Sequence, residues 1–217
     1  MTTPAQQFYG RWARLYDRLA SLPGVASWRS RTADLLDPAP GDTVVEMGCG
    51  TGANVPHLRG RVGSDGRVLG IDLTREMLAR ARTHDARVGS TVDYVQADAT
   101  RPPIERADAV LATFVVGMFD DPGAVVERWC DLVGPGGRVA LLNFQRSDKA
   151  LATPLNLAFE GFVRLSSPGG RLSRSSHASA FERRVTQARE TLTTRTRDRG
   201  FETFAGGYLG VLAGTVE

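Results

Sequence analysis

The sequence predicts an α/β fold built on a doubly wound, mostly parallel β-sheet. Short runs of Val, Ile and Leu recur between residues 42 and 145, and stretches of helical length and spacing separate them. Gly, Pro or Asp bounds the runs. Runs that are apolar throughout are typical of parallel strands, which are buried on both faces. Strand and helix in alternation predicts right-handed crossovers between neighbouring strands.

Two helices are expected before this core. The first carries an apolar stripe at three- and four-residue steps, formed by Phe8, Trp12, Leu15, Leu19 and Leu22. Pro23-Gly24 ends it, and Val25–Leu36 is expected to form the second helix, closed before Pro38.

The core itself should contain five strands and their connecting helices. Thr74–Ala86 and Pro122–Val133 have the length and apolar spacing of helices. The expected strands are Asp42–Met47, Arg67–Asp72, Val92–Ala97, Ala107–Val116 and Gly137–Phe144.

The remaining residues should cover and close the sheet. Leu151–Leu165 is expected to be helical, with Pro154 near its start, and a loop over Ser166–Ser176 follows. A further helix should end at Gly200, and residues 200–211 should supply one or two closing strands. That helix is marked by Phe181, Val185, Ala188 and Leu192. No repeat or linker divides the 217 residues, so a single domain is expected.

Composition excludes several classes of protein. Hydrophobic residues make up 41% and the net charge is only +3, which excludes a disordered chain. Cys49 and Cys130 cannot form a disulfide framework, and no signal peptide or membrane-spanning run is evident, so a cytoplasmic protein is expected. The three histidines lack ligand spacing, so no metal site is expected, and no nucleic-acid module is present.

The segment from Val44 to Asn54, VVEMGCGTGAN, carries the most chemical information. A buried strand ends near the acidic Glu46, and three alternating glycines lead to a helix start. Glycine permits backbone angles that other residues avoid, and it lets a ligand lie against bare backbone. The free N–H groups of the following helix can hold a carboxylate.

Two further acids follow later strands of the same sheet. Asp72 comes twenty residues after Gly52, at the end of the second strand, where its carboxylate can accept hydrogen bonds from both hydroxyls of a ribose. Asp98 ends the third strand, where it can meet an adenine amino group. These positions predict a nucleoside-type cofactor.

The run EMGCGTG, followed by GIDLT, QADA and GPGGR, resembles the class I S-adenosylmethionine-dependent methyltransferases over residues 42–145. The resemblance implies a Rossmann-like, seven-stranded sheet and S-adenosyl-L-methionine as cofactor. It further implies that the glycine loop holds the methionine part, Asp72 with Leu73 the ribose, and Asp98 with Ala99 the adenine. Thr113 and Phe114 would border the methyl end. The cofactor-binding residues expected from it are Tyr16, Glu46, Gly48, Cys49, Gly50, Gly52, Asn54, Asp72, Leu73, Met77, Asp98, Ala99, Thr113 and Phe114.

The N-terminal residues are similar to the opening of the ubiquinone/menaquinone C-methyltransferases and the bacterial phospholipid N-methyltransferases. The similarity rests on FY … WARLYD and on SWR at residues 27–29. It implies that residues 1–40 form lid helices, with Tyr16 near the amino-acid end of the cofactor. Residues 41–145 would then be the cofactor-binding core, and residues 146–217 the substrate side. The resemblance fades after Phe144, so it does not identify the substrate.

Several other interpretations stay open. A dinucleotide-binding protein would carry GxGxxG rather than GxGxG, although the acid at Asp72 fits both. Glu46 could be a strand-end carboxylate bonded to backbone N–H groups, and Asp72 a helix cap. Tyr16 could be a packing aromatic, and Cys49 a small residue that the loop tolerates.

The predicted activity is methyl transfer to a small-molecule acceptor of the quinone or natural-product kind. No residue stands out as a general base, so the catalytic residues remain unassigned. One alternative is a phospholipid N-methyltransferase, because arginines outnumber acids after residue 170 and could contact an anionic membrane. A solvated helix face explains the same arginines. The other alternative is a non-catalytic cofactor-binding protein, and either a monomer or a homodimer is compatible with the sequence.

Overall fold

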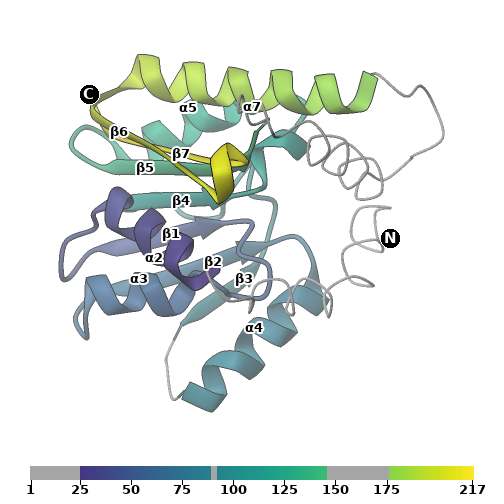
Figure 1. Cartoon of the computed structure of the whole chain (residues 1–217). Coiled ribbons are helices and arrows are strands. Elements are labelled where there is room, and N and C mark those ends of the chain that lie inside the picture. The colour runs from purple at the N-terminus through teal and green to yellow at the C-terminus, as the bar shows by residue number, and fades with distance from the viewer. Residues whose placement is uncertain (1–24, 89–91, 146–175) are drawn as a thin grey trace.

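A seven-stranded sheet with strand order β3-β2-β1-β4-β5-β7-β6 forms the centre of the molecule (Figure 1). The computed structural model describes residues 25–88, 92–145 and 176–217. The strands are β1 (Thr43–Met47), β2 (Arg67–Asp72), β3 (Asp93–Gln96), β4 (Ala109–Thr113), β5 (Arg138–Phe144), β6 (Thr196–Phe204) and β7 (Leu209–Val216). The helices are α2 (Val25–Leu36), α3 (Val55–Val62), α4 (Arg75–Val88), α5 (Pro122–Val133) and α7 (Ser176–Arg195), with short 3-10 turns η1 (Val116–Met118) and η2 (Ala205–Gly207).

The five strands β1 to β5 pair in parallel, and β7 and β6 close the sheet antiparallel. The chain runs outward from β1 to β3 on one side, and then returns to place β4 beside β1 on the other. In open α/β sheets a ligand binds outside the carboxyl ends of the strands where the order reverses. The fold therefore places any ligand site beyond the ends of β1 and β4.

Two hydrophobic clusters cover the two faces of the sheet. One contains α5 and α7 with Trp129 fully buried among them, and the other contains α2, α3 and α4. The strands contribute side chains alternately to the two clusters, as Val44 and Val45 do in β1. Burial on both faces explains why these strands are apolar throughout.

The expected helix Val25–Leu36 and the five core strands are confirmed with small changes at their ends. The fourth strand ends at Thr113 rather than Val116, because Phe114 takes a φ of +62° and turns the chain out of the sheet. Val116 then begins η1.

The predicted end of the last helix at Gly200 is wrong. Helix α7 ends at Arg195, and Gly200 lies inside strand β6. Thr196 starts that strand because its backbone pairs with Val216 of β7. Its hydroxyl donates to the carbonyl of Leu192, in the last turn of α7, over 2.6 Å. Two closing strands form, and the second runs to Val216 rather than residue 211.

Some predicted features lie outside the described residues: the helix over residues 8–22 with Tyr16, the helix Leu151–Leu165, and residues 166–175 of the predicted loop. Among the helices that the structure describes, none has both the length and the apolarity that a membrane crossing needs.

Candidate functional site

The glycine loop leaves β1 at Met47 and reaches α3 at Val55. Gly48, Gly50 and Gly52 have φ angles of 71°, 55° and 78°, a region that L side chains rarely adopt. The backbone N–H groups of Gly48 and Cys49 both donate to the carbonyl of Ile71, over 2.8 and 2.9 Å, which ties the loop to β2. A Cβ at Gly50 would meet nothing within 4 Å. At Gly50 the loop therefore presents bare backbone to open space, whereas a Cβ at Gly48 or Gly52 would clash with Val115 or Tyr94.

Asp72 connects the end of β2 to this loop. Its Oδ2 accepts from the Gly50 N–H over 2.9 Å, and its Oδ1 accepts from the Thr74 N–H over 2.7 Å. Burial raises the pKa of this carboxyl, and the two backbone hydrogen bonds oppose the rise. The second of these bonds is the helix-cap contact weighed above. A residue that served only as the cap of α4 would make no bond to the glycine loop. Because Asp72 also bonds to the Gly50 N–H, its carboxylate holds Gly50 in position.

Glu46 lies at the bottom of the site, only 1% exposed. Its Oε1 accepts from the Asn54 side-chain amide over 2.5 Å, and its Oε2 is buried with no hydrogen-bond partner. Burial raises its pKa to about 7, although the Asn54 hydrogen bond and the charge of Arg29 act against the rise. The interpretation of Glu46 as a carboxylate bonded to backbone N–H groups is therefore wrong, because its described donor is a side chain.

Asn54 is the N-cap residue of α3, yet its side chain makes no cap hydrogen bond. The amide instead donates to Glu46 and, over 3.1 Å, to the hydroxyl of Thr113, while its Oδ1 accepts from Arg29 Nη1 over 2.8 Å. An N-cap Asn normally stabilises its own helix. Here that stabilisation is given up, and Asn54 joins β1, β4 and α2 at one point.

Asp98 and Ala99 lie in the turn after β3. Asp98 is exposed, and its Oδ1 accepts from the Thr100 N–H over 2.8 Å. The carbonyl of Ala99 accepts from the indole N–H of Trp129 over 2.9 Å, which anchors the turn to α5. The Asp98 side chain does not bond to Glu46 or Asp72. The turn is nevertheless joined to the end of β2, because the Ala97 N–H donates to the carbonyl of Asp72 and the Gln96 amide donates to the carbonyl of Leu73, both over 3.1 Å.

The other predicted residues follow β2 and β4, or lie in α4 and in the loop itself. Phe114 stacks on Phe144 with ring centroids 4.5 Å apart. Met77 is buried and Leu73 is 41% exposed. Cys49 is also buried, and burial raises its pKa well above the usual value, which keeps the thiol protonated and unsuited to nucleophilic attack.

Two polar residues of this region were not selected from the sequence. Arg29 contacts Asn54, as described above, and its Nε is buried without a partner. Asn143, near the end of β5, is fully buried, and neither atom of its amide has a partner. A polar residue in the otherwise apolar run RVALLNF was the signal available for Asn143. For Arg29 the only signal in the sequence was its place in the SWR segment at residues 27–29.

Arginines of the C-terminal region largely bond within the molecule. Arg184 pairs with Asp120, and Arg195 pairs with Glu127 and Asp131. Arg189 donates to Gln145 and to the carbonyl of Gly210, and Arg199 donates to the carbonyls of Thr193 and Thr196. The ion pairs join α7 to α5 and to the turn before it, Arg189 joins α7 to the end of β5 and to β7, and Arg199 bonds at the junction of α7 and β6. These intramolecular contacts give the arginines a structural role.

Comparison with known proteins shows which family the chain is similar to. The family model described as "Methyltransferase domain" matches residues 45–141. The chain is 34% identical to the phosphatidylethanolamine N-methyltransferase of Cereibacter sphaeroides over 162 residues, which are 71% of this chain and 74% of that protein. It is 27% identical to a ubiquinone/menaquinone biosynthesis C-methyltransferase of Escherichia coli over 198 residues, which are 87% of this chain and 77% of that one.

Other relatives are matched over a smaller part. The nocamycin O-methyltransferase of Saccharothrix syringae is 35% identical over 136 residues, and this match spans 58% of the chain but only 49% of the relative. Among solved structures, a SAM-dependent methyltransferase of Aquifex aeolicus aligns with a TM-score of 0.58 and 16% identity over 87% of this chain and 89% of that one. The magnesium protoporphyrin IX methyltransferase of Synechocystis, solved with bound SAM, aligns with a TM-score of 0.53 and 16% identity over 89% of this chain and 76% of that one.

Proposed function

Because the chain belongs to the S-adenosylmethionine-dependent methyltransferases, we propose that it transfers a methyl group from S-adenosylmethionine to a small-molecule acceptor. The observation that carries the proposal is the buried Glu46, whose Oε2 has no hydrogen-bond partner and which precedes a glycine loop that is open at Gly50. A buried carboxylate is costly unless it is paired. A ligand with a cationic group at this point would supply the missing partner.

The described residues fit the methyl donor along its length. Glu46 is suited to the ammonium of the amino-acid end, and the bare backbone at Gly50 allows close approach of the chain between amino acid and ribose. Each oxygen of Asp72 already accepts one hydrogen bond and keeps a further lone pair, enough to accept from the two ribose hydroxyls. The turn at Asp98 and Ala99 would border the adenine.

The bound donor supplies a methyl group already activated on a sulfonium, so the protein needs mainly to orient the acceptor and exclude water. Thr113 and Phe114 end β4 beside Asn54, and the φ of +62° at Phe114 turns the chain away from the sheet there. We assign these two residues to the boundary between donor and acceptor. None of the described side chains at this boundary is assigned as a general base.

The acceptor proposed here is small, planar and largely apolar. Trp28, Phe114, Phe144 and Phe204 all pack in one cluster on the α2 face of the sheet, at the ends of β4 and β5. Aromatic rings favour flat apolar partners through stacking and area burial. Relatives named as acting on quinones and natural products support the same class.

Calorimetry with S-adenosylmethionine, and with NAD as the competing dinucleotide, tests the donor. We expect binding of S-adenosylmethionine and none of NAD; the reverse result would remove the proposal. A single-turnover assay with labelled methyl donor and a panel of hydroxyquinones and phenolic polyketides then tests transfer. Donor binding without transfer to any acceptor, including those in a cell extract, would favour a non-catalytic binding protein.

A phospholipid acceptor is the second candidate, because the Cereibacter sphaeroides relative is named for phosphatidylethanolamine. Arg184 and Arg195 already pair with acidic residues of the same chain, which argues against a membrane-binding role for those arginines. Sedimentation with vesicles containing anionic lipid and phosphatidylethanolamine, at low and at high salt, separates the two candidates. Binding at low salt that high salt reverses, together with methylation of the lipid, would favour the phospholipid acceptor.

A further inference from the structure

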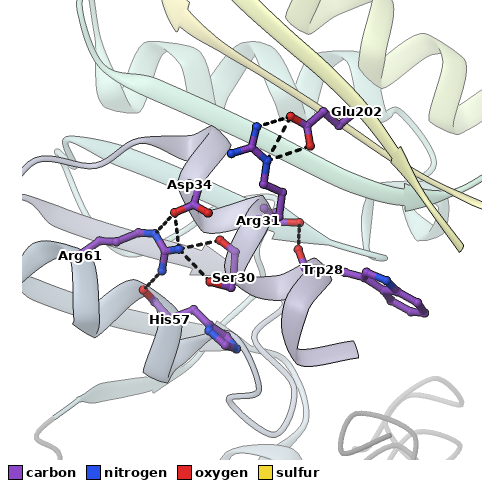
Figure 2. A network of polar contacts seen from close by, with 8 residues as sticks. Trp28, Ser30, Arg31, Asp34, His57, Arg61 and Glu202 are labelled. Carbon is purple, nitrogen blue, oxygen red and sulfur yellow. Dashed lines mark hydrogen bonds and ion pairs between the residues drawn. The ribbon is translucent and has the colours of Figure 1, made fainter. Parts of the chain in front are cut away.

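Arg29 is held in a fixed position by the way α2 is attached to its neighbours. Figure 2 shows Arg31 of α2 paired with Glu202 of β6, and Arg61 of α3 bonded to Ser30 and Asp34 of α2. Arg138 of β5 also donates to the carbonyls of Leu35 and Leu36. The helix is therefore tied to α3, β5 and β6, and these contacts hold Arg29 at the site.

The guanidinium of Arg29 is incompletely paired. Nη1 donates to Asn54 over 2.8 Å, while Nε is buried and has no partner. Burial lowers the pKa of Arg29, and the charge of Glu46 opposes this effect. An arginine has five N–H donors in a planar fork that matches a carboxylate. The buried guanidinium of Arg29 thus has an N–H donor, Nε, without an acceptor, just as the buried carboxylate of Glu46 has an oxygen, Oε2, without a donor.

Arg29 and Glu46 form no direct ion pair; Asn54 lies between them and bonds to both. Each charge thus keeps a free hydrogen-bonding atom, Nε on one side of Asn54 and Oε2 on the other. Opposite charges held apart in this way suit a ligand that carries both an ammonium and a carboxylate. The α-amino acid end of the methyl donor is such a group.

We propose that Arg29 binds the carboxylate of the donor's amino-acid end, opposite the ammonium at Glu46. The inference rests on the proposed function, and it adds a second charged group that selects donors with an intact amino acid. Arg29 would then act as a specificity-determining residue, because a nucleoside sulfonium that lacks the carboxylate gains nothing from it.

Decarboxylated S-adenosylmethionine is the matched probe, since it keeps the sulfonium and the ammonium and lacks only the carboxylate. Calorimetry compares both ligands on the wild-type protein, Arg29→Met and Arg29→Lys. We expect the wild type to prefer S-adenosylmethionine at least about tenfold, and Arg29→Met to lose about ten- to a hundredfold for this ligand. Arg29→Met should bind the decarboxylated probe within about threefold of the wild type, and Arg29→Lys should lie between.

Arg67→Ala is the control, because Arg67 is exposed and pairs at the surface with Asp93 of β3 rather than with α2 or the site. It should leave the preference between the two ligands unchanged. An Arg29→Met protein that loses both ligands equally, or neither, would overturn the inference and leave Arg29 as a structural counter-charge of Glu46. A wild-type protein that binds neither ligand would instead overturn the proposed function, and this inference with it.

Discussion

The carboxylate of Asp72 accepts a hydrogen bond from the backbone N–H of Gly50 over 2.9 Å. This bond joins the end of β2 to the middle of the glycine loop, so the residue that we assign to the ribose also shapes the backbone that we assign to the methionine part. The two parts of the donor site are therefore coupled before any ligand is bound.

Asp72→Ala should weaken binding of S-adenosylmethionine by at least about tenfold, because charge-assisted hydrogen bonds to the ribose and the Gly50 contact are both lost. Asp72→Asn keeps one acceptor oxygen and should lose less. Calorimetry measures both variants. Asp93→Ala, which removes an exposed carboxylate paired with Arg67, is the control and should bind normally. Unchanged affinity in Asp72→Ala would contradict the assignment of Asp72 to the donor.

Donor affinity should rise with pH through the pKa of Glu46. Burial raises this pKa to about 7, so the carboxyl is largely protonated at pH 6 and ionised at pH 8. The ammonium of the donor favours the ionised form of Glu46, but the donor's α-amino group, with an ordinary pKa of about 8, is partly deprotonated at pH 8. Affinity at pH 8 should therefore exceed that at pH 6 by about fivefold. Glu46→Gln should bind weakly at both values, with a smaller change between them. A wild-type affinity independent of pH in this interval would exclude Glu46 as the ammonium partner.

The same group should reduce the stability of the ligand-free protein as the pH rises. Its folded pKa of about 7 lies above the usual value of 4.5, so the folded state binds more protons than the unfolded state between these values. Unfolding free energy therefore falls across that interval, by about 3 kcal/mol for this group alone. Urea denaturation should show Glu46→Gln more stable than the wild type at pH 8, with a smaller difference at pH 5.

Gly52→Ala should destabilise the protein by at least about 2 kcal/mol. The φ of +78° disfavours any side chain, and the new Cβ would lie 2.7 Å from the hydroxyl of Tyr94. Gly41→Ala, with a φ of +93° and nothing within 4 Å of its Cβ, isolates the backbone strain and should cost about 1 kcal/mol. In a Tyr94→Phe background the cost of Gly52→Ala should fall; equal costs in both backgrounds would exclude the steric contact.

Asn143→Leu should stabilise the ligand-free protein by about 1 to 2 kcal/mol, because it replaces a fully buried amide that has no hydrogen-bond partner with an apolar side chain of similar size. Thermal and urea unfolding measure this change. Leu141→Asn, which places an amide at a buried apolar position of the same strand, should have the opposite effect. A loss of stability in Asn143→Leu would show that the amide is satisfied in solution.

The family and the α/β fold were predictable because they depend on local patterns. The apolar runs of β1, β4 and β5 reflect burial on both faces, and the loop needs glycine where φ is positive, as at Gly50 and Gly52. The boundary between α7 and β6 was not predictable in this way. Thr196 begins a strand because it pairs with Val216 of β7, a contact that helical spacing in α7 cannot reveal.

The sequence by itself determined the positions of the strands along the chain, of the glycine loop, and of the acidic residues Glu46 and Asp72. Each of these features depends on one contiguous segment of the sequence. Only the tertiary structure decided that Asn54 leaves its capping role to join Glu46 to Arg29, which lies 25 positions away in the sequence. The physical reason is burial: a carboxylate and a guanidinium removed from water need partners, and the packing of α2 against α3, β4 and β5 decides which groups are near enough to serve.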